Sequence, residues 1–232
     1  LVTVHQSRRW DRDFLALRAV VEAGQLGEVF NFETFVGGFG HPCRTWHSEE
    51  SISGGAIYDW GSHHVDWILQ LYGSMPTTVR CVGHKRVWHD VTNLDQLTLH
   101  MMWSDGREAT FRQSDIAAIR RPKFYVQGTT GTLEGHYRPM VSERLEPGRG
   151  FVTEESHHAE APVDLEIRHF DGSVVNVKPV RHPGWGFHVN LADHLLLGEP
   201  LAVTPDSTRD VVRVLEAGHR SAVEGGRVIT LD

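Results

Sequence analysis

A series of β-branched and aromatic segments joined by short turns occupies the middle of the chain. "SDGR" at residues 104–107 and the Asp171-Gly172 pair each separate two such segments. Aspartate followed by glycine favours the tight turns that connect antiparallel strands. We therefore predict a largely antiparallel sheet. The strand candidates are residues 28–36, 78–88, 94–103, 107–114, 123–128, 132–136, 166–170, 173–178 and 227–231.

Helical periodicity surrounds and interrupts these strands. Phe14, Leu17, Val20 and Val21 recur at helical spacing in residues 11–23, ahead of Gly24. Further helices are expected at residues 55–72, 186–197 and 205–224, and residues 37–53 form a loop long enough to suggest a function. Hairpins combined with helices predict an α+β fold, a large, mostly antiparallel open sheet with helices packed on one face.

Composition excludes several classes of protein. The 232 residues carry a formal net charge of −7, which argues against a nucleic-acid partner. No apolar run approaches the ~18–20 residues that span a bilayer, and no signal peptide opens the chain. The two cysteines, Cys43 and Cys81, form no CxxC motif and fit reduced thiols in a cytoplasmic protein.

The segment "GGAIYDWGSHHVD" at residues 54–66 concentrates acids and histidines on a predicted helix. At about 100° per residue, Asp59, His63, Asp66 and Gln70 share one narrow stripe, whereas His64 lies in the apolar arc. A carboxylate beside an imidazole favours its protonated form, which suits acid–base chemistry near neutral pH. A solvated helix face explains the same pattern.

A metal site is a further alternative, because the chain contains 16 histidines. The HExxH motif is absent, and two adjacent histidines on a helix cannot direct both rings at one ion. Asp59 and His63 could supply two ligands, but no third ligand stands at a convincing spacing, so we expect no metal.

Residues 54–73, "GGAIYDWGSHHVDWILQLYG", resemble the GGG-x-L-x-D-x-G-x-H-x-x-D signature of the Gfo/Idh/MocA family of oxidoreductases, the glucose–fructose oxidoreductase and inositol dehydrogenase group. "HQSRRWDRDFLALRAVVEAGQLGEV" near the start is similar to the segment that follows the family's nucleotide-binding domain. "TPDSTRDVVRVLEAGHRSAVEGGRVITL" is similar to its C-terminal helix and last strand.

The resemblance implies that Asp59 and His63 line a substrate site facing a nicotinamide ring. His63 would exchange the hydroxyl proton while a hydride moves to or from NAD or NADP, and Asp59 would orient the substrate. The substrate would be a sugar, polyol or related hydroxyl compound. The family also implies a homodimer or homotetramer built through the open sheet face.

The chain departs from the family in ways that predict its extent. It contains neither a G-x-G-x-x-G turn nor the E-K-P motif of the family's N-terminal domain, and "GGFG" at residues 37–40 lacks the dinucleotide-binding spacing. The first methionine is Met75. We therefore expect residues 1–232 to be a single substrate-binding and oligomerisation domain, with residues 1–10 the remnant of a junction. Such a fragment would bind no cofactor and be inactive by itself.

Additional site candidates lie near the junction and in the loops. Arg8 is a candidate for cofactor binding. We expect substrate contacts from seven polar and aromatic residues: Arg9, Trp10, Arg44, Trp46, Tyr58, Trp185 and His188. A structural salt bridge is the alternative for the arginines at the junction. His157-His158 is interpreted as a solvated excursion.

A non-catalytic ligand-binding or dimerisation module of the same fold remains an alternative function. Such a module would use an apolar sheet face, and Leu97, Leu99, Met101 and Trp103 share one side of a predicted strand. Core packing explains their alternation equally well.

Overall fold

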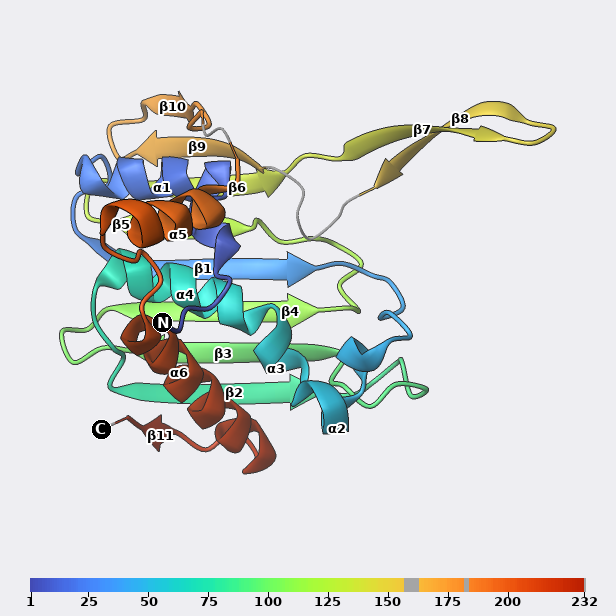
Figure 1. Ribbon diagram of the computed structural model, residues 1–232, viewed down its shortest axis with the longest axis horizontal. Coiled ribbons are helices and arrows are strands. Elements are labelled where there is room, and N and C mark those ends of the chain that lie inside the picture. Colours follow the sequence, from blue (N-terminus) through green and yellow to red (C-terminus); the bar gives the residue numbers. More distant parts are fainter. Residues whose placement is uncertain (157–162, 182–183, 232) are drawn as a thin grey trace.

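The computed structural model describes residues 1–156, 163–181 and 184–231, and the His157-His158 pair lies outside them. Nine strands form one open sheet in the order β10-β9-β6-β5-β1-β4-β3-β2-β11 (Figure 1). Its strands are β1 (Val29–Gly37), β2 (Thr78–His84), β3 (Gln96–Met102), β4 (Glu108–Ser114), β5 (Phe124–Gly128), β6 (Gly131–Tyr137), β9 (Val163–His169), β10 (Val174–Val177) and β11 (Ile229–Thr230). Every neighbouring pair is antiparallel except β1 and β4.

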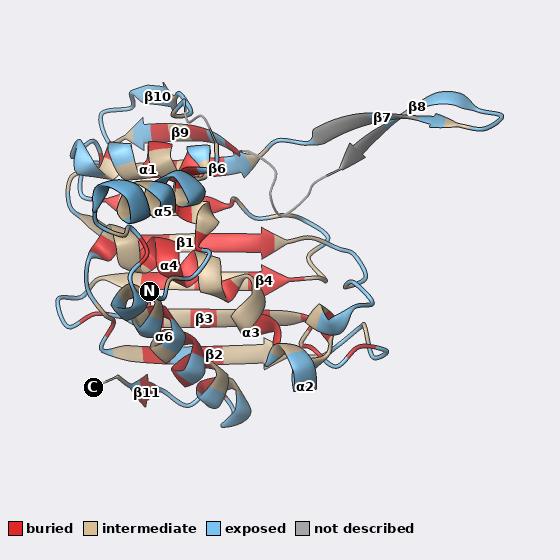
Figure 2. Ribbon diagram, viewed as in Figure 1, coloured by how far each residue is buried: buried red, intermediate tan, exposed pale blue. Residues whose placement is uncertain are grey.

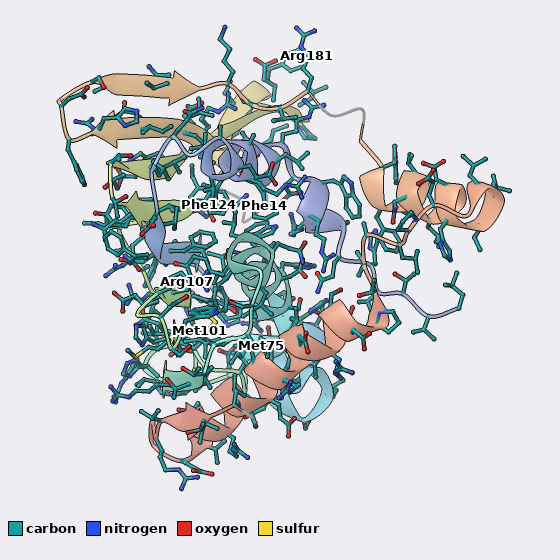
Figure 3. The ribbon with its side chains drawn as sticks, turned by 90° about the vertical axis from the view of Figure 1, so that its left-hand side faces the viewer. Phe14, Met75, Met101, Arg107, Phe124 and Arg181 are labelled. Carbon is teal, nitrogen blue, oxygen red and sulfur yellow. The ribbon has the colours of Figure 1, made fainter. Side chains whose placement is uncertain are left out.

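The principal helices all lie on one face of this sheet. They are α1 (Arg12–Glu22), α4 (Gly61–Tyr72), α5 (Gly186–Leu197) and α6 (Pro205–Val223). Turned edge-on, the sheet forms one layer and the helices the other, with Phe14, Phe124 and Met101 between them (Figure 3). All three of these side chains are fully buried. The predicted α+β class, with helices on one face, is confirmed.

Alternation along the strands separates the two faces of the sheet. Leu97, Leu99 and Met101 of β3 are fully buried, and Trp103 is nearly so, because odd-numbered residues point toward the helices. Their shared side is therefore the core side. The open face carries partly exposed polar residues, among them Thr98, His100, Thr110 and Arg112. Buried residues accordingly concentrate in the middle of the central strands (Figure 2).

The central strands β1 and β4 are parallel, so their C-terminal ends lie side by side at the same end of the sheet. Gly37 and Ser114 are register partners there. Gly37 has φ +131°, and a Cβ atom added there would lie 1.9 Å from the Ser114 carbonyl oxygen. Only glycine fits this close approach, so the residue fixes how the two strand ends meet.

Two differences from the sequence-based expectations concern local geometry. The helix expected over residues 55–72 is broken into α3 (Ala56–Asp59) and α4, with Trp60 between them, and the preceding loop contains the short turns η2 (Trp46–Ser48) and α2 (Glu50–Ser53). The periodicity gave no sign of the hairpin of β7 (Met140–Glu146) and β8 (Gly150–Ser156). This hairpin projects from the body (Figure 1), and the residues of its strands whose burial the structure describes are exposed or partly exposed, so no burial imposes alternation on them.

Within the described ranges, no helix combines the length and the apolar character needed to cross a membrane.

Candidate active site

A cavity of about 1020 Å³ opens at the C-terminal ends of strands β1 and β4. Its walls come from the loop after β1, from η2 and α3, from residues 93–94 and from the end of β4 with the chain that follows. This volume accommodates a small molecule of sugar or cofactor-fragment size. Asp59 and Trp60 line it, which brings the start of the histidine-containing helix to the cavity.

Asp59 is the predicted catalytic residue that reaches this cavity. It is the last residue of α3, and its Oδ1 atom lies 3.7 Å from Nδ1 of His47. Burial raises the pKa of the Asp59 carboxyl, and the charges of His47 and Arg8 oppose that rise. A partly desolvated carboxylate beside an imidazole can accept a hydrogen bond from a substrate hydroxyl.

His63, the other predicted catalytic residue, lies in the first turn of α4 and does not line the cavity. Its Nδ1 atom is 2.9 Å from Oε1 of Gln6. Gln6 is buried, and its Nε2 group donates to the Ser62 carbonyl at 3.1 Å. Asp59 and His63 thus lie on either side of Trp60, at the end of α3 and the start of α4, and each contacts a residue from another part of the sequence.

His64 points the other way, as the helical wheel predicts. It is fully buried, and its Nδ1 atom lies 2.6 Å from the Thr34 hydroxyl. Burial lowers the pKa of His64 well below its ordinary range, and the charge of Lys123 lowers it further. His64 is therefore a neutral core residue with a satisfied hydrogen bond.

Asp66, which the helical wheel places on the same stripe as Asp59 and His63, forms a buried ion pair with Arg9, one of the expected substrate contacts. The Arg9 Nε and Nη2 groups donate to the two carboxylate oxygens of Asp66 at 2.8 and 2.6 Å. Their side chains are 6% and 2% exposed. Arg9 also donates to the Ala202 carbonyl and to the Ser207 hydroxyl. The structural alternative thus holds for Arg9, because both of its charge-bearing edges are enclosed in protein.

The remaining candidates near the junction do not line the cavity. The Arg8 guanidinium lies 4.7 Å from the Trp60 ring centre and pairs with Asp11 at 3.2 Å, so it stands beside the Asp59 end of the site. Trp10 packs against Phe187 of α5. Trp185 and His188 contact each other on the exposed side of α5.

The other three substrate-site candidates, Arg44, Trp46 and Tyr58, do not line the cavity. Arg44 is highly exposed and pairs with Asp90 at 3.3 Å. Trp46 stacks on His47 with ring centres 3.8 Å apart, and so contacts a cavity residue without lining the cavity itself. Tyr58 packs near His219 of α6.

Sequence reasoning missed Asp115, which lines the cavity one residue beyond β4. Its pKa is raised to about 6, first by burial and then by the carboxylates of Asp95 and Asp59. Asp95 differs because it accepts from Lys85 and from the backbone N–H groups of Arg86 and Val87, which hold its pKa at about 2. The alternation Phe111, Gln113, Asp115 along one strand could have indicated that Asp115 faces the same side as the core.

Across the described residues, no group of three or more His, Cys, Asp or Glu side chains is arranged to hold a metal ion. A dinucleotide also finds no strand–turn–helix phosphate cradle there, because residues 37–40 continue from β1 into a loop and not into a helix. The residues present therefore do not fit a complete NAD(P) site.

The chain is thus an open sheet with helices on one face and a polar cavity where its two parallel strands end. Residues 14–134 match the family model described as the GFO/IDH/MocA C-terminal domain, and the chain belongs to the Gfo/Idh/MocA family.

Relatives of known sequence agree with this assignment. An oxidoreductase of Schizosaccharomyces pombe is 36% identical over 240 residues, covering 96% of this chain and 65% of its own. The scyllo-inositol 2-dehydrogenase (NADP(+)) IolW of Bacillus subtilis is 24% identical over 230 residues, covering 97% and 63%. The chain thus spans somewhat less than two thirds of these relatives.

Solved structures share the fold. The aldose-aldose oxidoreductase of Caulobacter crescentus superposes with a TM-score of 0.77 at 19% identity, covering 99% of this chain and 64% of that one. An NAD-binding protein of Listeria innocua gives a TM-score of 0.75 at 23% identity, covering 99% and 66%.

Proposed function

We propose that this chain is the substrate-binding domain of an NAD(P)-dependent oxidoreductase that moves a hydride between the cofactor and a hydroxyl-bearing carbon of a sugar, polyol or related compound. The observation that carries the proposal is that Asp59 and Trp60, at the family-like helix start, line a cavity of about 1020 Å³. His63 follows them in the first turn of α4. The names of the Bacillus subtilis and Caulobacter crescentus relatives support the substrate class.

His63 is assigned the proton transfer. In the oxidation direction, the substrate O–H proton passes to an imidazole nitrogen as the C–O bond acquires double-bond character, and the C–H bond gives up its electron pair with the hydrogen. The bound cofactor supplies the acceptor for that hydride. In the reverse direction, His63 returns the proton to the oxygen.

Asp59 is assigned the orientation of the substrate. Its carboxyl lines the cavity and lies near His47, so it can hold a neighbouring hydroxyl in a fixed position. The positive charge of Arg8 lies over the Trp60 ring and lowers the pKa of the Asp59 carboxyl. We assign Arg8 the contact with the cofactor.

The cofactor is expected from the rest of the protein. This chain spans 63–65% of relatives whose names include an NADP-dependent enzyme, and its described residues lack a phosphate cradle. We therefore propose that a nucleotide-binding domain completes the site, that residues 1–10 join the two domains, and that residues 1–232 alone are inactive.

The test uses the full-length protein that contains this chain. Purified protein is assayed for NADP⁺ or NAD⁺ reduction with scyllo-inositol and a panel of aldoses, and His63→Ala is compared with wild type. Loss of the general acid–base group should lower kcat by roughly 10²- to 10⁴-fold. His136→Ala is the matched control, because the His136 side chain is 62% exposed, pairs with Glu134 and does not line the cavity.

Three results would contradict the proposal. Wild-type turnover retained in His63→Ala would remove the residue from its role, and turnover by residues 1–232 alone would refute the division of labour. A full-length protein that binds no nicotinamide cofactor would instead favour the non-catalytic module.

Assembly and location are part of the same proposal. The polar open face, with Thr98, His100, Thr110 and Arg112, is proposed as the homodimer or homotetramer interface, which light scattering of an Arg112→Glu variant tests by the loss of the oligomer. The cytoplasm is the proposed location, and the free thiols of Cys43 and Cys81 support it.

A further inference from the structure

The buried amide of Gln6 connects the first residues of the chain to the helix that carries His63. Gln6 is 4% exposed and directly precedes the turn η1 (Ser7–Trp10). Its Oε1 atom lies 2.9 Å from His63 Nδ1, and its Nε2 group donates to the Ser62 carbonyl at 3.1 Å. One amide therefore contacts two consecutive residues of α4.

We infer that Gln6 is a positioning residue that holds His63 in the Nδ1–H tautomer, so that Nε2 is the nitrogen that exchanges the substrate proton. A carbonyl oxygen can only accept a hydrogen bond, so the ring nitrogen facing Oε1 must carry the hydrogen. A neutral imidazole has one N–H group, and the lone pair then resides on Nε2. The catalytic meaning of this tautomer rests on the proposed role of His63.

The orientation of the Gln6 amide is determined by its second hydrogen bond. If the amide were turned by 180°, its NH₂ group would face Nδ1 and its oxygen would face the Ser62 carbonyl, leaving two acceptors opposed in a buried position. Burying a polar group without a partner costs about 1–3 kcal/mol, so the observed orientation is strongly preferred. The Ser62 carbonyl thereby selects the amide orientation, and the amide selects the tautomer.

The attachment of Gln6 to the backbone keeps this arrangement rigid. The Gln6 N–H group donates to the Val4 carbonyl at 2.8 Å, and the Gln6 carbonyl accepts from the Arg9 N–H group at 3.2 Å. Arg9 is itself held by Asp66 of α4. Gln6 is thus held against α4 through the Arg9–Asp66 pair on its C-terminal side.

The first experiment needs no substitution. Long-range ¹H–¹⁵N correlation spectra of the full-length protein, labelled with ¹⁵N-histidine, are recorded at a pH where His63 is neutral, and its signals are assigned by their loss in His63→Gln. We expect a protonated Nδ1 and an unprotonated Nε2. Neutral histidine side chains in water favour the opposite tautomer, so an Nε2–H form in the wild-type protein would overturn the inference.

Variants then test whether Gln6 is the cause. Gln6→Leu removes the acceptor and should shift His63 to a majority of the Nε2–H form. Gln70→Leu, the same change on α4 two turns away, is the control and should leave the spectrum of His63 unchanged. An unchanged tautomer in folded Gln6→Leu would overturn the assignment.

Activity provides a second readout. We expect kcat of Gln6→Leu to fall roughly 10-fold or more, within the ~10²–10⁴-fold that acid–base catalysis contributes, with KM for the polyol changed less than twofold. A fall of equal size in Gln70→Leu contradicts the positioning role of Gln6. The tautomer is measured independently of turnover, so an active His63→Ala enzyme would refute the proposed function without refuting the role of Gln6.

Discussion

Replacing Asp66 by asparagine would remove the charge partner of Arg9 without changing the volume of the site. The pair is nearly fully buried, with side-chain exposures of 6% and 2% and two N–O distances of 2.8 and 2.6 Å. Breaking one half of a buried ion pair typically costs about 3–5 kcal/mol, because the other charge is left without compensation. Arg9 keeps its hydrogen bonds to Ala202 and Ser207, so we expect the lower end, about 3 kcal/mol.

Urea denaturation at 25 °C followed by circular dichroism measures this loss. For a domain of this size, ~3 kcal/mol corresponds to a fall in Tm of roughly 6–12 °C. Glu22→Gln is the control, because it also converts a carboxylate that pairs with an arginine, Arg18, at 3.5 Å on the exposed side of α1. Exposed pairs contribute less than about 1 kcal/mol, so this variant should unfold almost as the wild type does.

Asp66→Asn within about 0.5 kcal/mol of wild type would refute the assignment of Arg9 to a structural salt bridge. The double variant Arg9→Met, Asp66→Leu sharpens the test. Replacing both charges by apolar groups is often close to neutral, so part of the lost stability should return. Recovery should be incomplete, since the Ala202 carbonyl would lose its donor.

Two further predictions follow from buried polar groups around the site. Because the pKa of Asp115 is raised to about 6 from an ordinary 3.8, the native state holds this proton more tightly than the unfolded state, so the ionised carboxyl destabilises the fold above pH 6. Asp115→Asn should therefore be more stable than wild type by about 1–2 kcal/mol in urea at pH 8, with the gain shrinking as pH falls from 6 to 4; a less stable variant at pH 8 would contradict this. Thr34→Val should leave the buried ring nitrogen of His64 without its hydrogen bond and lower the free energy of unfolding in urea by about 1–3 kcal/mol. Thr110→Val on the open face is the control and should change the free energy of unfolding by less than about 0.5 kcal/mol. Equal effects of the two substitutions would argue against the Thr34–His64 hydrogen bond.

The sequence predicted the layers of the fold well because periodicity reports burial. Strand β3 alternates between buried and partly exposed residues because one face packs on helices, and α5 has the bounds expected from its sequence. The hairpin of β7 and β8 escaped prediction for the converse reason. It projects from the sheet, and those of its strand residues whose burial is described are exposed or partly exposed, so packing imposes no period on them.

The cavity was beyond sequence reasoning because it depends on which strands become neighbours. The sequence predicted β1 and β4 as strands but not their parallel pairing, which sets Gly37 beside Ser114 and leads the following residue, Asp115, to the wall of the cavity. Loop residues such as Arg44 and Trp46 were chosen for their chemistry. They do not line the cavity, whereas Cys43 and His47 of the same loop do.

The polar stripe on the central helix illustrates why a pattern on one helix cannot separate a catalytic group from a structural one. Asp59, His63 and Asp66 have equivalent places on a regular wheel, yet their partners come from distant segments: His47, Gln6 and Arg9 respectively. Asp66 is neutralised by a buried arginine, and so it stabilises the fold. His63 faces the neutral amide oxygen of Gln6, which in our proposal fixes a proton on Nδ1 and assigns proton exchange to Nε2. The chemistry of each residue in the stripe is thus decided by the segment that packs against it.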